Sequence, residues 1–591
     1  MLVPPGPVYL LKLLPFFLIP SALAYYAFLT ANKTFWGGSL PHWLIISVSA
    51  LARPLLFVFQ RYLNRYLEHR AAAANGAFVI PHVEEKLPNF AGFSLVKTLV
   101  ADIHKSHPGT AFQEWRKQYG STYQLRLPTD NRVITDDPDH VKAILATQFD
   151  AFHKGPVTYD MFRSLLGTGV FNSDGDMWKF HRNMTRPFFT RDRISDFEIF
   201  DRHASHALKL AKDRLAEGQP IDFQDLVSRF TLDSATEFLF GYQVDSLSAG
   251  LPYSPRSGIP NSSEFLNHSS NVFVDAFLAG QVQIAVRARR GPIWPLMEFW
   301  KDEVKPSREI VDGYTTPVML RALEERESND REKVAETGSD QTLLSHLVQH
   351  TQDKKVLKDE LLNLLVAGRD TTGCTLTYAF YMLCEHPDIA ARLRQEILEH
   401  VGPTDRPTYE NLRDLKYLRA FINEVLRLYP PVPFDGRTAR KSTVLHSKFP
   451  GSKPYYVPAG TRVLYSIMHI HRREDLWGPT ALEFDPDRFL DERLHKYLTP
   501  NPYIFTPFNA GPRICLGQQF AYQESSFFLV RLLQQFTNFR LAPEAQPEDS
   551  IPPKEWALQG GLIAKEKVRS ATHLTLYAKG GVWGRMDEVS N

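Results

Sequence analysis

The chain has 591 residues, of which 43% are hydrophobic and 23% charged, and its formal net charge is +2. This is ordinary globular composition with enough material for a large core. The near-neutral balance, without a basic tract interleaved with aromatic residues, argues against a nucleic-acid partner. There are only three cysteines and no C-x-x-C pair, which argues against a zinc site or a disulfide framework and fits a reducing compartment such as the cytosol.

Two apolar segments open the chain. Residues 13–30 carry no charge and approach the minimum length of a membrane span, and residues 43–59 are apolar apart from Arg53. Basic residues after a span favour the cytoplasmic side, and three follow the second segment: Arg61, Arg65 and Arg70. We therefore expect a membrane anchor over residues 1–70, with one or two spans, and a body that faces the cytosol.

Two other interpretations of these segments are weaker. A signal peptide should end at small residues, but the aromatic pair Tyr25-Tyr26 lies where a cleavage site is expected. A buried core helix is disfavoured because two apolar stretches come before any amphipathic pattern.

The segment after the anchor is predicted to be a linker, followed by a small sheet. Residues 71–91 contain two prolines and no clear periodicity, so the body is expected to begin near Gly92. Residues 121–127 and 131–135 alternate apolar and polar side chains, which is typical of strands.

The rest of the chain is predicted to be mainly α. Helical periodicity dominates residues 343–428. Two exposed loops are predicted, at residues 246–263 and at residues 324–341. Both stretches are polar and rich in proline or charge.

Trp178 and Arg182 have the spacing of side chains that share one helix face, and both carry N–H donors. His181 lies between them and is a candidate metal ligand. We expect His181 instead at the surface, or in contact with metal-binding residues without binding the metal itself. A cysteine further along the chain is better placed to bind metal.

Residues 356–383 show a long apolar helix pattern that is interrupted by the run AGRDTTG at residues 367–373. Buried polar groups need partners, and each glycine in a helix costs about 1 kcal/mol relative to alanine. Function explains such a run more readily than packing does, which makes Asp370 and Thr371 candidate catalytic residues. The alternative is a helix kink whose hydroxyls bond back to main-chain carbonyls.

Glu424 and Arg427 lie three residues apart in a helix pattern that ends before Pro430, so their side chains share a face. On this spacing alone, a surface ion pair of little energetic weight is an equally simple interpretation.

Cys515 carries the strongest signal in the chain, in the pattern F-x-x-G-x-R-x-C-x-G over residues 508–517. Gly511 and Gly517 permit a tight loop in which main-chain N–H groups point at the sulfur. Such a thiolate is a suitable proximal ligand for a haem iron. Phe508 is placed to shield the sulfur from water, and Arg513 to pair with a haem propionate. A buried free cysteine is the alternative.

These motifs resemble those of cytochrome P-450 monooxygenases. Residues 508–513 and 165–193 are similar to the fungal membrane-bound branch that hydroxylates n-alkanes and fatty acids, although the first segment also suits animal and plant fatty-acid hydroxylases. The resemblance covers roughly residues 92–580. It implies the P-450 fold, a large helical domain with a smaller β-rich part, over residues 92–591.

The resemblance also implies roles for individual residues. Thr371 would hydrogen-bond iron-bound dioxygen or a water, Asp370 would help to relay protons, and Gly368 would let the helix open over the haem. Further side chains would bind the haem propionates, namely Trp178, Arg182, Arg437 and Arg513. A buried triad would lock the core without taking part in catalysis, formed by Glu424, Arg427 and Arg488.

The implied cofactor is haem b with an axial cysteine thiolate. No G-x-G-x-x-G fingerprint is present, so electrons from NADPH would arrive through a separate cytochrome P-450 reductase, with cytochrome b5 as a further candidate donor. The reductase would dock near Arg513. The other implied partners are O2, a lipophilic substrate and the endoplasmic reticulum membrane.

Two alternatives to a monooxygenase remain from the sequence. One is an isomerase or dehydratase with the P-450 fold, and the other is a haem-thiolate sensor without turnover. Neither needs the Asp370-Thr371 pair, which this chain has.

The substrate pocket is expected to be lined from four mainly apolar segments: residues 156–170, 366–370, 431–435 and 559–565. The insertion at residues 246–263 is expected near the helices through which substrate enters. No residue type in these segments marks where the end of a hydrocarbon chain would be held.

Overall fold

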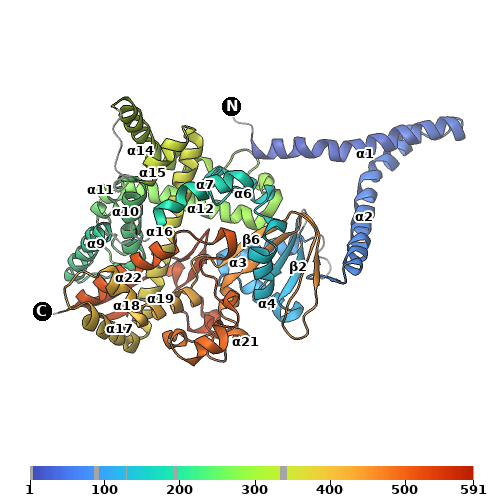
Figure 1. Ribbon diagram of the computed structural model, residues 1–591. Helices are drawn as coiled ribbons and strands as arrows, with labels where there is room; N and C mark the ends of the chain where they lie inside the picture. The colour runs from blue at the N-terminus through green and yellow to red at the C-terminus, as the bar shows by residue number, and fades with distance from the viewer. Residues whose placement is uncertain are drawn as a thin grey trace.

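Helices dominate the body of the protein, which confirms the predicted mainly α class, and the sheet that holds β2 (Thr122–Arg126) and β6 (Phe434–Ala439) lies at one side (Figure 1). The computed structural model describes residues 4–85, 92–127, 130–190, 194, 197–332 and 342–589. The first two helices are α1 (Pro5–Phe35) and α2 (His42–Ala74), and α1 projects away from the body (Figure 1). The helices that follow are α3 (Phe93–Lys105), α4 (Thr110–Tyr119), α5 (Pro138–Lys142), α6 (Pro156–Leu166), α7 (Gly175–Thr185), α9 (Glu198–Ala216), α10 (Phe223–Phe240), α11 (Ser263–Leu266), α12 (Ser269–Arg290), α13 (Trp294–Met297), α14 (Lys305–Glu332), α15 (Leu343–His350), α16 (Lys354–Glu385), α17 (Pro387–His400), α18 (Tyr409–Asp414), α19 (Lys416–Leu428), α20 (Ile467–His471), α21 (Glu474–Trp477) and α22 (Gln518–Gln535).

The strands form separate small sheets. The largest has the order β2-β3-β9-β6-β4, with β3 and β9 parallel and the other neighbours antiparallel. The predicted strands over residues 121–127 and 131–135 are confirmed, and they pair with Thr122 opposite Thr135. The strands are β1 (Phe78–Val79), β2 (Thr122–Arg126), β3 (Asn131–Thr135), β4 (Phe152–His153), β5 (Ile221–Asp222), β6 (Phe434–Ala439), β7 (Thr443–Leu445), β8 (Tyr455–Val457), β9 (Arg462–Ser466), β10 (Phe536–Leu541), β11 (Ser570–Thr572), β12 (Leu576–Ala578) and β13 (Trp583–Glu588).

Helix α16 runs through the helical region and is buried on nearly all sides, which suits its continuous apolar pattern. Asp353 caps its start by accepting hydrogen bonds from two main-chain N–H groups, and Pro387 follows its end. The polar run at 367–373 does not interrupt it. At Gly368, a Cβ would lie 2.8 Å from the Cβ of Ala235 on α10, so this glycine permits the two helices to pack closely.

The largest hydrophobic core lies among α9, α10, α16, α19 and α22. Aromatic rings fill much of it, and Phe223 stacks on Phe380 with centroids 4.0 Å apart. This core supports one side of α16, and the loop that carries Cys515 leads directly into α22.

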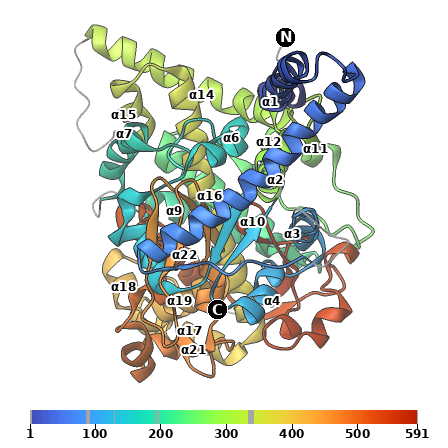
Figure 2. The ribbon, with the colours of Figure 1, turned by 90° about the vertical axis from the view of Figure 1, so that its right-hand side faces the viewer.

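Helices α1 and α2 are each long and apolar enough to cross a membrane. Asn32 closes the turn between them, because its side chain bonds to both the main-chain N–H and the carbonyl of Leu40. The Arg53 guanidinium lies 3.6 Å from the centre of the Phe16 ring, so the charge that interrupts the second apolar segment packs between the helices. In Figure 2, α2 runs in front of the body of the protein, from α1 at the upper right toward the lower left.

The segment predicted to be a linker is part of the packed structure as far as residue 85. Helix α2 continues to Ala74, strand β1 pairs in parallel with β8, and Val83 is buried. Residues 86–91 lie outside the described residues. The apolar residues just before Pro81 were the missed signal, because Phe78 and Val79 pair with a strand that lies more than 370 positions later in the chain.

The two predicted loops also differ from expectation. Residues 246–263 are irregular, but Leu247 and Leu251 are buried and Asp233 accepts hydrogen bonds from the main chain of Ser246 and Leu247. None of these residues lines the central cavity described below. Residues 324–332 continue α14, and residues 333–341 lie outside the described residues.

Candidate functional site

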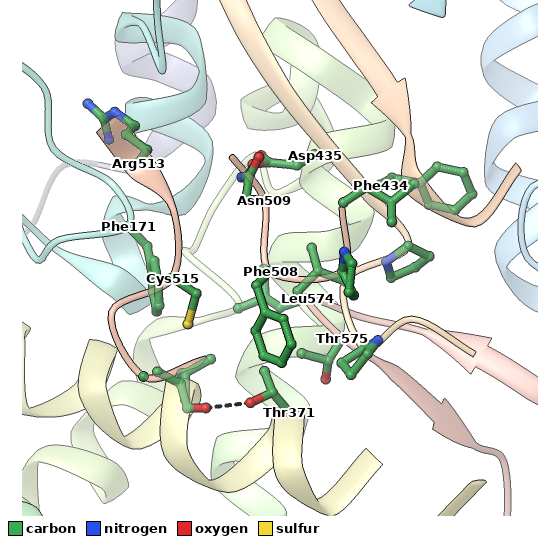
Figure 3. A pocket seen from close by; sticks show the side chains of 18 of the residues that line it. Phe171, Thr371, Phe434, Asp435, Phe508, Asn509, Arg513, Cys515, Leu574 and Thr575 are labelled. Carbon is green, nitrogen blue, oxygen red and sulfur yellow. Dashed lines mark hydrogen bonds between the residues drawn. The ribbon is translucent and has the colours of Figure 1, made fainter. Parts of the chain in front are cut away.

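A mainly apolar cavity of about 490 Å³ lies at the centre of the molecule. Its walls come from α16, α6, α12, the loop of residues 507–517 and the turn between β11 and β12. Figure 3 shows the side chains of Cys515 and Thr371 at this cavity, with Leu574 and Thr575 at another side. Residues that are far apart in the sequence therefore meet around one concave, mainly apolar space, which is the usual form of a small-molecule site.

The Cys515 loop has a geometry that only its own sequence allows. Gly511 has φ +66°, and a Cβ there would lie 1.9 Å from the carbonyl oxygen of Leu145. Any other residue would be strained and would collide with the main chain. The N–H of Cys515 donates to the Phe508 carbonyl at 3.0 Å, which closes the loop. The sequence pattern therefore encodes a rigid support for the sulfur.

The Cys515 thiol borders the cavity beside main-chain and guanidinium donors. Burial raises its pKa above the ordinary value, while the Gly517 N–H and the charge of Arg182 act in the opposite direction. These two groups favour the thiolate, and metal binding would displace the remaining proton. Among the described residues, no group of three or more His, Cys, Asp or Glu side chains could hold a metal ion. The Cys515 sulfur is the cysteine donor that borders this cavity.

Basic side chains gather at one end of the cavity. Arg437 and Lys154 both contact Asp435 at 2.8 Å, and Arg513 contacts Asp174 at 2.7 Å. Burial lowers the pKa of Lys154 to about 8, and the charge of Arg437 contributes to this shift. Burial likewise lowers the pKa of Arg513 to about 10.

Lys154 was missed in the sequence, because no pattern links it to residues that lie hundreds of positions later. The cavity also exposes the indole of Trp178, whose ring centre is 4.4 Å from the guanidinium of Arg513.

The donor set fits a haem. One sulfur faces the cavity from a fixed loop, and three cations with two carboxylates leave one excess positive charge at its edge. The negatively charged haem propionates would be attracted to these cations, and the apolar walls suit the macrocycle. Arg182 also lines the cavity, and its guanidinium donates to the Ile514 carbonyl at 3.0 Å and so braces the cysteine loop. Its contact with a propionate stays a prediction.

Helix α16 presents Thr371 to the cavity one turn after Gly368, which also lines the cavity and packs against Ala235 of α10. The Thr371 hydroxyl donates to the Ala367 carbonyl at 2.7 Å, which is the back-bonding considered as an alternative from the sequence. Asp370 does not line the cavity. Its carboxylate accepts hydrogen bonds from Gln281 at 2.8 Å and Arg369 at 2.7 Å. Only one member of the predicted pair therefore faces the site directly.

Glu424, Arg427 and Arg488 come together in the core. Glu424 Oε2 is 2.6 Å from Arg427 Nε, Glu424 Oε1 is 3.0 Å from Arg488 Nε, and all three side chains are buried. Arg427 also donates to the carbonyls of His471 and Ala481. This network fastens α19 to the segment before the cysteine loop and lies outside the cavity lining.

Three of the four predicted pocket segments contribute to the lining, and one does not. Residues of 156–170, 366–370 and 431–435 line the cavity, but none of residues 559–565 does. The turn at residues 572–575 takes their place, because the antiparallel pairing of β11 and β12 directs its tip at the cavity. Arg289 of α12 is a further lining residue that the sequence did not indicate.

His181 is buried rather than exposed. Its Nδ1 lies 2.9 Å from a Glu360 carboxylate oxygen, and its Nε2 is hydrogen-bonded to the Thr168 carbonyl at 2.9 Å. It ties α7 to α16 and is not a cavity residue.

The chain is similar to known proteins over most of its length. A family model described as "Cytochrome P450" matches residues 87–566. Cytochrome P450 monooxygenase pvhE of Talaromyces variabilis is 34% identical over 506 residues, which cover 82% of this chain and 88% of that protein. Cytochrome P450 52A3-A of Candida maltosa is 34% identical over 86% of this chain and 94% of its own length. Cytochrome P450 52A13 of Debaryomyces hansenii is 38% identical over 71% of this chain and 78% of its own length.

Proposed function

Because the chain belongs to the cytochrome P450 family and is a monooxygenase of that family, we propose that it hydroxylates the hydrocarbon chain of an n-alkane or a fatty acid. The observation that carries this proposal is that Cys515 and Thr371 border one mainly apolar cavity. An apolar lining suits a hydrocarbon, which offers no polar group for recognition along its length. The similarity of residues 165–193 and 508–513 to fungal alkane and fatty-acid hydroxylases supports the same substrate class.

The family's haem-thiolate cofactor would be held by this chain at named residues. We assign the axial ligand to Cys515 and the shielding of its sulfur to Phe508, with Gly511 fixing the loop. The excess positive charge at one end of the cavity supports propionate binding by Lys154, Arg437 and Arg513, with Trp178 as a further donor.

Haem bound through a thiolate supplies the activation of dioxygen. The chain's own residues would place the C–H bond, exclude water and deliver protons. The Thr371 hydroxyl can exchange its bond to Ala367 for one directed into the cavity. Asp370 would act from behind Thr371, where Arg369 and Gln281 hold its carboxylate in place.

We assign the electrons to NADPH through a separate reductase, with cytochrome b5 as a second donor. The endoplasmic reticulum membrane is the proposed location, with the body in the cytosol. The two apolar N-terminal helices and the basic residues after them support this assignment. Arg513 is engaged with Asp174 and largely buried, so the exposed Arg186, one turn beyond Arg182, is a better contact for an acidic partner.

The test is the ferrous–CO spectrum, followed by NADPH consumption with a reductase and product analysis across alkanes, fatty acids and polycyclic aromatics. We expect a thiolate-type spectrum and NADPH use that depends on an alkane or a fatty acid. The spectrum without NADPH use that depends on any substrate would favour an isomerase, a dehydratase or a sensor. Oxidation of the aromatic compounds alone would contradict the substrate class.

A further inference from the structure

A further group of basic side chains lines the cavity besides Lys154, Arg437 and Arg513, namely Arg132, Arg289 and Arg462. Arg289 of α12 lines the cavity and donates hydrogen bonds to the Ala285 carbonyl at 3.1 Å and to Thr572 Oγ1 at 2.9 Å. Both acceptors are neutral, and no ion pair joins Arg289 to a carboxylate within the part of the chain that the structure describes. A guanidinium with no charged partner therefore faces an apolar space.

The neighbouring charges do not neutralise Arg289. Asp130 is shared between Arg132 and Arg462, with N–O distances of 3.1 and 2.7 Å. Asp102 also borders the cavity, but its two oxygens accept the N–H groups of residues 109 and 111 at the start of α4. Three arginines and two aspartates leave one excess positive charge among these side chains.

Burial removes water from the Arg289 guanidinium, which makes its positive charge unfavourable unless an anion binds to it. It lowers the pKa of Arg289 to about 10, with Asp102 acting against this shift and Arg132 adding to it. The guanidinium therefore remains protonated at neutral pH. A buried cation is stable when an anion with matching hydrogen-bond geometry approaches it, and a carboxylate fits a guanidinium through two parallel bonds.

We propose that Arg289 binds the carboxylate of a fatty acid, with the Thr572 hydroxyl as a second donor, so that the hydrocarbon chain extends through the cavity toward the Cys515 end. This rests on the proposed function and narrows it from hydrocarbons in general to fatty acids. The propionates have their own cations in Lys154, Arg437 and Arg513, so Arg289 is left for the substrate. Fixing one end of the chain also selects which carbons reach the reacting end.

The experiment measures substrate-induced spectral shifts of the full-length, haem-loaded enzyme. The probes are hexadecanoic acid, methyl hexadecanoate and hexadecane, which share a chain and differ in the charged end. The variants are Arg289→Gln and Arg289→Lys. Arg290→Gln is the matched control, because Arg290 is the next residue of α12 and does not line the cavity. Haem content and the melting temperature verify that each variant is folded.

In Arg289→Gln, we expect the Kd for the acid to rise about 10- to 100-fold while the Kd values for ester and alkane stay within about twofold. Arg289→Lys should keep part of the acid affinity, and Arg290→Gln should match the wild type. Hydroxylation of the acid should also spread over more carbons in Arg289→Gln. Equal losses for acid and ester, or no loss for the acid, would overturn the proposal.

The outcomes separate this inference from the proposed function. A wild-type enzyme that binds hexadecane and the ester but not the acid would refute the carboxylate site and leave the hydrocarbon substrate class standing. A wild-type enzyme that binds none of the three probes, although its ferrous–CO spectrum is normal, would refute both.

Discussion

The cysteine loop and the opposite wall of the cavity are built in different ways. The loop is one continuous segment, closed by the hydrogen bond from the Cys515 N–H to the Phe508 carbonyl and turned by the left-handed Gly511. The opposite wall combines side chains of α16, α12 and the turn at residues 572–575. The comparison teaches that metal binding in this protein depends on local geometry, whereas substrate recognition depends on packing between distant segments.

Replacing the ligand is the strongest test of the loop. In Cys515→Ser we expect loss of the thiolate-type ferrous–CO spectrum and of monooxygenase activity down to background, because a hydroxyl does not replace the thiolate as a ligand. Circular dichroism should show unchanged helix content. A variant that kept the spectrum would show that another residue binds the iron.

Breaking the buried triad of Glu424, Arg427 and Arg488 tests whether this network stabilises the core next to the cysteine loop. Glu424→Gln leaves two buried arginines without a counter-charge, so we expect the free energy of unfolding to fall by about 3–5 kcal/mol. Denaturant unfolding measures this value. The control is Glu325→Gln, which removes an exposed pair with Arg321 and should cost less than about 0.5 kcal/mol. Equal effects would mean that the triad is not a structural lock.

Removing one hydroxyl tests the opposite wall. In Thr371→Ala we expect the amount of product per NADPH consumed to fall by roughly tenfold or more, with the electrons diverted to peroxide, because proton delivery is impaired. The matched control is Thr377→Ala, since Thr377 makes the same type of bond to a main-chain carbonyl but does not face the cavity. Unchanged coupling in Thr371→Ala would contradict the proton-relay assignment.

The smallest expected effect is a change in the Kd for hexadecane. It tests which of two C-terminal segments, residues 572–575 or residues 559–565, contacts the substrate. Leu574 lines the cavity, whereas Leu562 lies in the segment predicted from the sequence and does not. We expect Leu574→Ala to raise the Kd for hexadecane about three- to tenfold through lost apolar contact. Leu562→Ala should leave the Kd unchanged. The reverse result in spectral titrations would mean that residues 559–565 form the wall after all.

The sequence predicted the elements whose contacts are local. The strands over residues 121–127 and 131–135 were predictable because apolar and polar side chains alternate along them. Each strand pairs with the other, which is its neighbour in the sequence. The proximity of Glu424 and Arg427 follows from helix spacing. By contrast, the direction of the Asp370 side chain depends on Gln281 of α12, and the burial of residues 246–263 depends on Asp233 of α10. Such partners leave no periodic signal.

The sequence by itself determined the family, the cysteine and the loop that supports it, because a tight turn and a helix face place residues at short spacings in nearly the same way wherever they occur. Only the tertiary structure decided that Lys154 faces Asp435, that Arg289 forms no ion pair among the described residues, and that the turn at residues 572–575 lines the cavity. Those positions result from the packing of the whole chain, in which many weak apolar contacts fix distances that no local pattern records.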